Sequence, residues 1–141
     1  MIINFHPKEI QSKAVAKLIE RLLAANPTEV LHATDKTKEE WQAIIKSPES
    51  MVFVGPVYWW GMGHDMDKWM QDVLTYNFAF SFDTGEKVGL LDGRAFEIHL
   101  THGTPTQWAD TMKKNIEERL KTGIFGYCNS QIEISFYYDK D

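Results

Sequence analysis

Short apolar runs alternate along the chain with longer segments in which apolar residues recur every three or four positions. The runs are typical of buried strands, and they lie at Met1–Phe5, Glu29–Ala33, Met51–Val57, Arg94–Leu100 and Ile132–Tyr138. The periodic segments predict helices, because that spacing places apolar side chains on one helix face. We expect these helices to run from about Val15 to the Asn26-Pro27 stop, from Thr37 to Pro48, from Met62 to Tyr76 and from Gln107 to Lys121.

Two further local signals refine this pattern. Thr37 and Glu40 have the spacing of a capping box at a helix start. Phe78–Asp92 shows neither periodicity and contains glycines at positions 85 and 89, so we expect a long connection there.

This alternation predicts one α/β domain over residues 1–141, with five strands in a doubly wound parallel sheet and helices on both faces. Right-handed crossovers favour the strand order 2-1-3-4-5. A sheet of this kind binds its ligand beyond the carboxyl ends of the strands, where the winding reverses. Here that place is the gap between the first and third strands, and it is reached by the loops after the first, third and fourth strands.

The first of these loops is His6–Ser12, which ends where the first helix begins. Backbone N–H groups at a helix start attract anions, and Ser12 adds a hydroxyl and Lys13 a positive charge. In the simpler interpretation Ser12 only caps the helix and Pro7 only forms a turn. The Gly-rich fingerprint of dinucleotide-binding domains is absent from this loop.

The second loop is Pro56–Gly63, with the sequence PVYWWGMG. Neighbouring residues of an extended chain point to opposite faces, so Tyr58, Trp59 and Trp60 cannot all enter one core. At least one of these rings is expected to line a surface or a pocket, where it could contact another flat ring. Packing beneath the next helix or at a subunit interface is an equally good explanation of the aromatics.

The third loop is Thr101–Pro105, which offers hydroxyls, a glycine and the imidazole of His102 ahead of a helix. His102 is a candidate proton donor or hydrogen-bond partner, although a single histidine is more often only a solvated loop residue. Three polar or aromatic loops at one edge of one sheet are more informative than any of them alone.

Composition narrows the possible functions. The net charge of −5 argues against a nucleic-acid partner, which calls for a basic face. A single cysteine excludes an internal disulfide, so we expect a reducing, cytoplasmic setting. No signal-peptide pattern and no apolar run long enough for membrane insertion is found. Glu97 and His99 share a strand face, but no third ligand stands beside them in sequence, so we expect no zinc.

Residues 53–74, FVGPVYWWGMGHDMDKWMQDVL, resemble the flavodoxin-like NAD(P)H:quinone reductase family. That family has a proline, an aliphatic residue, then Tyr-Trp-aromatic, followed by a tryptophan in a helix; here these are Pro56, Val57, Tyr58, Trp59, Trp60 and Trp69. Downstream, GLLDGR at residues 89–94 and THGTP at residues 101–105 are similar to the segments before and after its fourth strand. The opening His6-Pro7 with Ser12 is similar to its phosphate loop.

The resemblance implies a flavodoxin-like fold and a non-covalently bound flavin that passes a hydride from NAD(P)H to a quinone or similar acceptor. It implies cofactor contacts at His6, Ser12, Pro56, Val57, Tyr58, Trp59, Trp60, Thr101, His102 and Gly103. Independently of the resemblance, the charge of Lys13 makes it a further candidate contact, and the imidazole of His102, where the family usually has a threonine, makes it the candidate catalytic residue. FMN is favoured over FAD, because the chain is short where larger members hold the adenosine half of FAD. Family members are commonly homodimers.

Three alternatives to a quinone reductase stay open. The first is a regulatory or ancillary subunit, like the flavodoxin-like partners of potassium efflux systems. The second is an electron carrier like flavodoxin, although the Thr/Ser-Gly phosphate loop of true flavodoxins is absent. The third is a domain of this fold that binds no flavin.

Overall fold

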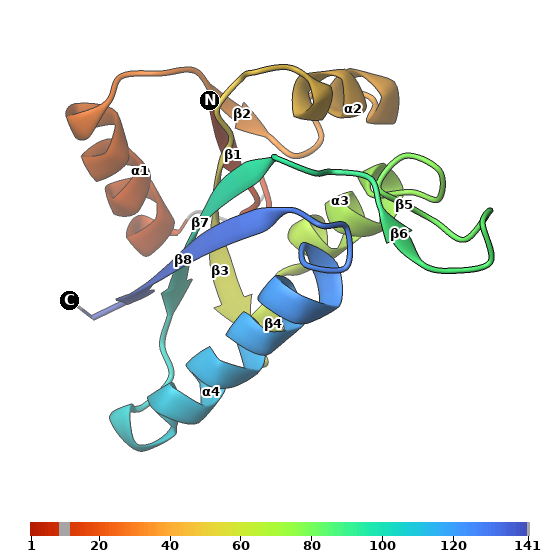
Figure 1. Cartoon of the computed structure of the whole chain (residues 1–141). Helices are drawn as coiled ribbons and strands as arrows, with labels where there is room; N and C mark the ends of the chain where they lie inside the picture. The colour runs from red at the N-terminus through yellow and green to blue at the C-terminus, as the bar shows by residue number, and fades with distance from the viewer. Residues whose placement is uncertain (9–11, 141) are drawn as a thin grey trace.

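Five parallel strands form the main sheet of the computed structural model, which describes residues 1–8 and 12–140. In sheet order they are β2 (Val30–His32), β1 (Ile2–Asn4), β3 (Val52–Tyr58), β7 (Ala95–His102) and β8 (Gln131–Tyr138) (Figure 1). Counted along the chain, these five strands have the order 2-1-3-4-5. The doubly wound parallel sheet expected from the sequence is therefore confirmed.

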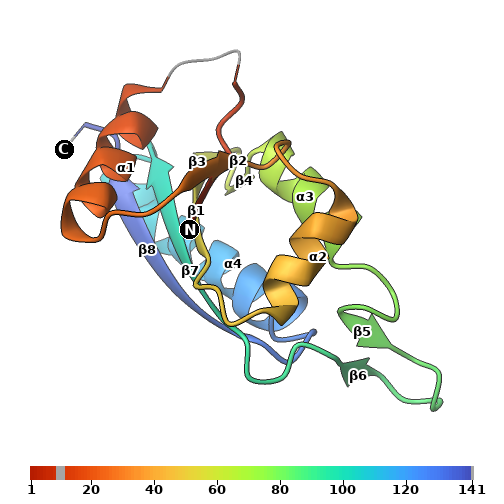
Figure 2. The same cartoon turned by 90° about the horizontal axis from the view of Figure 1, so that it is seen from above.

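Helices cover the two faces of this sheet unequally (Figure 2). On one face, α1 packs through Val15 and Leu18 against Val54 of β3 in a small core. On the other face a larger core contains Phe53, because successive side chains of a strand point to opposite faces. Of the α-helices in the described residues, α1 (Lys13–Ala25) lies on the first face, and α2 (Lys38–Lys46), α3 (His64–Val73) and α4 (Thr106–Glu118) lie on the second.

The helix ends follow the local signals of the sequence. Ser12 is the N-cap of α1, and its hydroxyl oxygen accepts a hydrogen bond from the backbone N–H of Val15 (3.2 Å). Thr37 and Glu40 form the predicted capping box of α2, in which each side chain binds the other's backbone N–H. Asn26 is the C-cap of α1, as the Asn26-Pro27 stop predicts.

The third helix begins later and ends earlier than predicted. Gly61–Met62 forms a short strand, β4, which pairs antiparallel with the end of β3. Residue 62 is therefore held in a hairpin, and α3 starts only at His64. Leu74 is its C-cap, so Tyr76 lies outside the helix.

Three more boundaries differ from the sequence pattern. The long connection contains a small antiparallel hairpin of β5 (Phe80–Ser81) and β6 (Val88–Gly89). Strand β7 continues through His102, because His102 still pairs with Tyr138 of β8. Helix α4 continues into a π-helical segment, Arg119–Ile124, instead of ending at Lys121.

The half of the sheet formed by β7 and β8 is bare on the α1 side within the described residues (Figure 2). Its side chains there are mostly polar: Glu97, Glu133 and Ser135 are exposed, whereas His99 is buried beside Tyr137, which packs against the small core under α1. Polar side chains suit a sheet face that meets water. Among the described helices, none is long and apolar enough to cross a membrane.

Candidate functional site

The three predicted loops meet at the carboxyl edge of the sheet. Asn4 at the end of β1 lies beside Val54 of β3, and Pro56 of β3 lies beside Thr101 of β7. The chain therefore leaves β1, β3 and β7 from adjacent places in the sheet, next to the point where the winding reverses. This edge is where doubly wound sheets bind their ligands.

Trp59 and Trp60 make the tight turn between β3 and β4. Both residues adopt the left-handed backbone conformation, with φ angles of 51° and 57°. Two consecutive positive φ angles are typical of a type I′ hairpin turn, which favours Asn and Gly. A side chain in this conformation costs about 1–2 kcal/mol. The Trp59 side chain is fully exposed, at 102%, so no buried apolar surface of this residue offsets the strain.

The second loop is tied to the first by a histidine–tyrosine pair. His6 Nε2 lies 3.2 Å from the hydroxyl of Tyr58, and His6 Nδ1 lies 3.1 Å from the carbonyl oxygen of Pro7. The backbone N–H of His6 also donates to the side-chain oxygen of Asn4 (2.9 Å). His6 is 5% exposed and Tyr58 is 48% exposed, so these predicted site residues form a unit in which a buried histidine contacts a partly exposed tyrosine.

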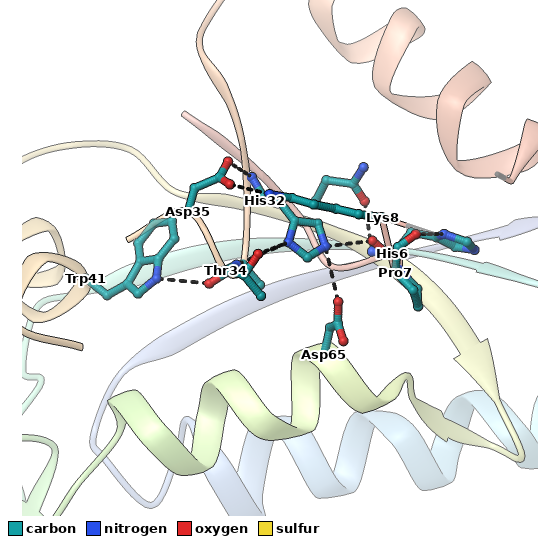
Figure 3. Close-up of polar contacts among 10 residues, drawn as sticks. His6, Pro7, Lys8, His32, Thr34, Asp35, Trp41 and Asp65 are labelled. Atoms are coloured by element: carbon teal, nitrogen blue, oxygen red, sulfur yellow. Dashed lines mark hydrogen bonds and ion pairs between the residues drawn. The ribbon is translucent and has the colours of Figure 1, made fainter. Parts of the chain in front are cut away.

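A buried histidine of the neighbouring strand supports this unit (Figure 3). His32 Nε2 lies 2.8 Å from the carbonyl oxygen of His6 and 3.1 Å from a carboxylate oxygen of Asp65 in α3. His32 Nδ1 accepts the backbone N–H of Thr34 (3.1 Å), so a neutral ring carries its proton on Nε2 and donates it. His32 thus joins the loops after β1 and β2 to the start of α3.

The turn after β2 is closed by Asp35. Its carboxylate accepts hydrogen bonds from the Lys8 ammonium (2.7 Å) and from the His32 backbone N–H (2.7 Å). These two donors, Lys8 first, lower the pKa of Asp35 below its usual range. Lys8 is thereby held over the β2 turn at the start of the first loop (Figure 3).

The rest of the first loop only partly fits the predicted anion site. The Ser12 oxygen caps α1, as the simpler interpretation predicts, and its O–H remains able to donate. Lys13 is exposed in the first turn of α1. A cavity of about 530 Å³ opens here, and His6, Ser12 and Lys13 are among its lining residues. Residues 9–11 of the predicted loop lie outside the described residues.

The third predicted loop, Thr101–Pro105, begins inside strand β7, so its first two residues are buried in the sheet. Thr101 and His102 belong to β7 and are each 4% exposed, because β8 pairs with them to its end. His102 packs beside the ring of Tyr138, and its Nδ1 accepts the backbone N–H of Thr104 (3.2 Å). Gly103 follows at the surface, where an added Cβ would meet only Asp139 Oδ2, at 3.5 Å.

Titratable groups elsewhere give no metal centre: no cluster of three or more His, Cys, Asp or Glu side chains with ligand geometry is found among residues 1–8 and 12–140. Glu97 and His99 do share a face as predicted, with 3.3 Å between carboxylate and Nε2.

Residues 1–139 match the model of the Flavodoxin_2 family, which is described as a flavodoxin-like fold. The chain belongs to the Flavodoxin_2 family. The resemblance drawn from residues 53–74 is therefore confirmed, and the observed strand order is the one that this family name implies.

Two of three proteins similar to this Flavodoxin_2 chain carry oxidoreductase names. An uncharacterized NAD(P)H oxidoreductase of Haemophilus influenzae is 22% identical, over 99% of this chain and 83% of that protein. An NADPH-quinone reductase from P. pentosaceus has a TM-score of 0.71 at 18% identity, covering 98% of this chain and 83% of that one. General stress protein 14 of Treponema denticola, solved in complex with FMN, has a TM-score of 0.67 at 20% identity, covering 97% and 84%.

Sequence reasoning missed His32 and Asp65 as parts of this site. His32 follows a weak strand signal, and its partners lie 26 and 33 positions away, at His6 and Asp65. No spacing rule links residues that far apart. The one usable signal was the position of His32 at the end of the strand next to the first loop.

Proposed function

We propose that this chain is an FMN-dependent NAD(P)H oxidoreductase that reduces a quinone or a similar small acceptor. The observation that carries the proposal is the strained Trp59–Trp60 turn at the carboxyl end of β3, which presents a fully exposed indole at the switch point of the sheet. Strained backbone of this kind clusters at functional sites. The names of the relatives support the same reaction class.

The residues of this edge fit a flavin. Trp59 offers an open aromatic face, and Pro56, Val57, Tyr58 and Trp60 form the hairpin that carries it. Ser12 and Lys13 supply a donor and a charge for a phosphate beside the helix start. Thr101 of β7 lies beside Pro56 at the base of the hairpin, and Gly103 follows the end of β7. When bound, a flavin supplies the two-electron chemistry, and the protein binds it, orients it and excludes water.

FMN is the proposed flavin, with FAD as the second choice, and a neighbour of the same fold is solved with FMN. His6 has a structural part in this proposal: its contact with Tyr58 sets the distance between the first and second loops. His32 and Asp65 are positioning residues, because they hold the His6 carbonyl from the side of β2 and α3.

His102 is the proposed proton donor. Its Nδ1 accepts from Thr104, so a neutral ring carries its proton on Nε2, and that atom is the one able to donate. His102→Ala is expected to slow flavin reduction or reoxidation by 10²-fold or more, the usual scale of acid–base catalysis. His102→Asn keeps an acceptor for Thr104 but lacks the acid, so full activity in His102→Asn would leave His102 with a structural part only.

A homodimer is also proposed, with the β5–β6 hairpin as the candidate contact. Tyr76, Phe82 and Val88 on and beside this hairpin are 47%, 46% and 41% exposed. Grouped apolar side chains of this kind often mark interfaces. Light scattering on the parent chain and on Phe82→Ser tests the contact, because a dimer held there would dissociate in the variant.

The direct test of the function is steady-state oxidation of NADPH and NADH by the FMN-loaded protein, with menadione as acceptor. Acceptor-dependent turnover is the expected result. A protein that binds FMN but shows no turnover with menadione or with other quinones would contradict the enzyme proposal and would favour an ancillary subunit.

A further inference from the structure

A groove of about 590 Å³ runs between α1 and the carboxyl end of β8, over the bare part of the sheet. Its walls include four cationic residues, and Figure 2 shows α1 lying along this side of β8. The basic residues are Lys13, Lys17, Arg21 and Lys140, and the acidic lining residue is Asp139.

Within the described residues, no ion pair involves Lys13, Lys17, Arg21 or Lys140. Lys13, Lys17 and Arg21 are four positions apart in turn, so they lie on one face of α1. Such a concentration of positive charge is unexpected in a chain of net charge −5, and it lowers the energy of an anion placed in the groove.

Arg21 lies over an aromatic ring of the sheet, that of Tyr137 in β8. Its guanidinium lies 5.8 Å from the centre of the Tyr137 ring. The Tyr137 hydroxyl is 2.7 Å from His99 Nδ1, and His99 Nε2 is 3.3 Å from Glu97. The Tyr137 and His99 rings also stack, with 27° between their planes. These contacts favour a position of the Arg21 guanidinium over the Tyr137 ring before any ligand arrives, which reduces the entropy lost on binding.

We propose that this groove binds the 2′-phosphate of NADPH and so makes the chain prefer NADPH to NADH. A planar guanidinium with three lysine ammonium groups in the same groove suits a phosphate monoester, which carries up to two negative charges and three acceptor oxygens. This inference rests on the proposed oxidoreductase function, and it names the cosubstrate of that site.

The position of the groove agrees with this assignment. Lys13 and Thr101 line the groove and also belong to the proposed flavin site. From Lys13 to Arg21 the groove extends about 12 Å along α1, at about 1.5 Å per residue. A dinucleotide whose nicotinamide end lies at the flavin site can therefore place its adenosine end along this stripe.

The first experiment measures binding of 2′,5′-ADP to the protein by calorimetry, with and without FMN, and with 5′-AMP as the ligand that lacks the 2′-phosphate. The expected result is that 2′,5′-ADP binds at least about tenfold tighter than 5′-AMP, the scale of one charged hydrogen bond. Lys17→Gln and Arg21→Gln are each expected to remove most of this difference. Lys114→Gln, an exposed lysine of α4, is the matched control and should keep it.

Equal binding of the two nucleotides, or an unchanged preference in both groove variants, would overturn the proposal. Binding of 2′,5′-ADP can be measured without flavin, so this outcome is separate from the proposed function. An enzyme that turns over but binds 2′,5′-ADP no tighter than 5′-AMP refutes only the groove assignment. A chain that binds no flavin refutes the proposed function whatever 2′,5′-ADP does.

The second experiment compares KM values for NADPH and NADH in the FMN-loaded enzyme. Arg21→Gln is expected to raise the ratio of the NADPH value to the NADH value about tenfold, and Lys114→Gln should leave this ratio unchanged. FAD is tested in parallel. If FAD binds tighter than FMN and Arg21→Gln removes that advantage, the groove serves the flavin and not the cosubstrate, and the proposal is wrong.

Discussion

Replacing Trp59 by asparagine should make the apo protein more stable and the flavin complex weaker. Trp59 has a φ of 51° and is fully exposed, so its side chain contributes strain and no burial. Asparagine tolerates the left-handed conformation, which removes about 1 kcal/mol of a strain of about 1–2 kcal/mol. For a chain of this size that gain corresponds to a rise in Tm of about 3 °C.

The effect on flavin binding has the opposite sign. An aromatic contact is worth about 0.5–1.5 kcal/mol beyond its buried area, so loss of the indole should raise the Kd for FMN at least about 2- to 10-fold. Urea unfolding of the apo proteins and fluorescence titration with FMN measure the two quantities separately. Trp59→Phe is the matched control, because it keeps both an aromatic ring and the strained backbone, and it should change neither quantity much.

Two results would refute this reasoning. If Trp59→Asn destabilises the apo protein, the turn is not strained or the indole makes contacts that its exposure conceals. If Trp59→Asn binds FMN as tightly as the parent chain does, Trp59 does not contact the flavin, and the strained turn needs another explanation.

Three further predictions concern stability. The pKa of Asp35 is lowered in the folded state, so its ionised form stabilises the fold above the unfolded pKa of about 3.9. This contribution is lost as pH falls through the lower folded value. Asp35→Asn should therefore lower the urea midpoint at pH 7, and the difference between the midpoints of the parent chain and the variant should disappear in acid. Thr37→Ala should cost about 1 kcal/mol by loss of its cap, measured by the same unfolding assay, and no loss would contradict the capping box. Gly89→Ala should destabilise the protein by about 1–3 kcal/mol, because a Cβ there would lie 2.5 Å from the Cys128 backbone. Thermal unfolding measures this loss. Gly123→Ala is the control and should be tolerated, because a Cβ at position 123 would meet open space.

The sheet could be predicted because each of its signals is local. Apolar runs mark β3 and β7, and the order of strands follows from handedness once they alternate with helices. The cap of α2 was equally accessible, since Thr37 and Glu40 are three residues apart. Signals of this kind depend only on neighbours in the sequence.

The details of the site could not be predicted in the same way. The hairpin of β3 and β4 has only two residues in its second strand, which is too short to show alternation. Trp59 and Trp60 occupy turn positions that usually hold Asn and Gly, so the residue types argue against the turn that is observed. His102 is buried because β8 pairs with the end of β7, and strand pairing is a tertiary effect.

The most direct test of the central claim is a visible absorption spectrum of the purified chain after FMN is added and the excess removed by gel filtration. We predict that flavin absorbance stays with the protein at close to one FMN per chain, and that Trp59→Asn retains less of it. A colourless protein from which both FMN and FAD wash away would contradict the flavin site at this edge of the sheet, although the fold and the strained Trp59–Trp60 turn would still stand.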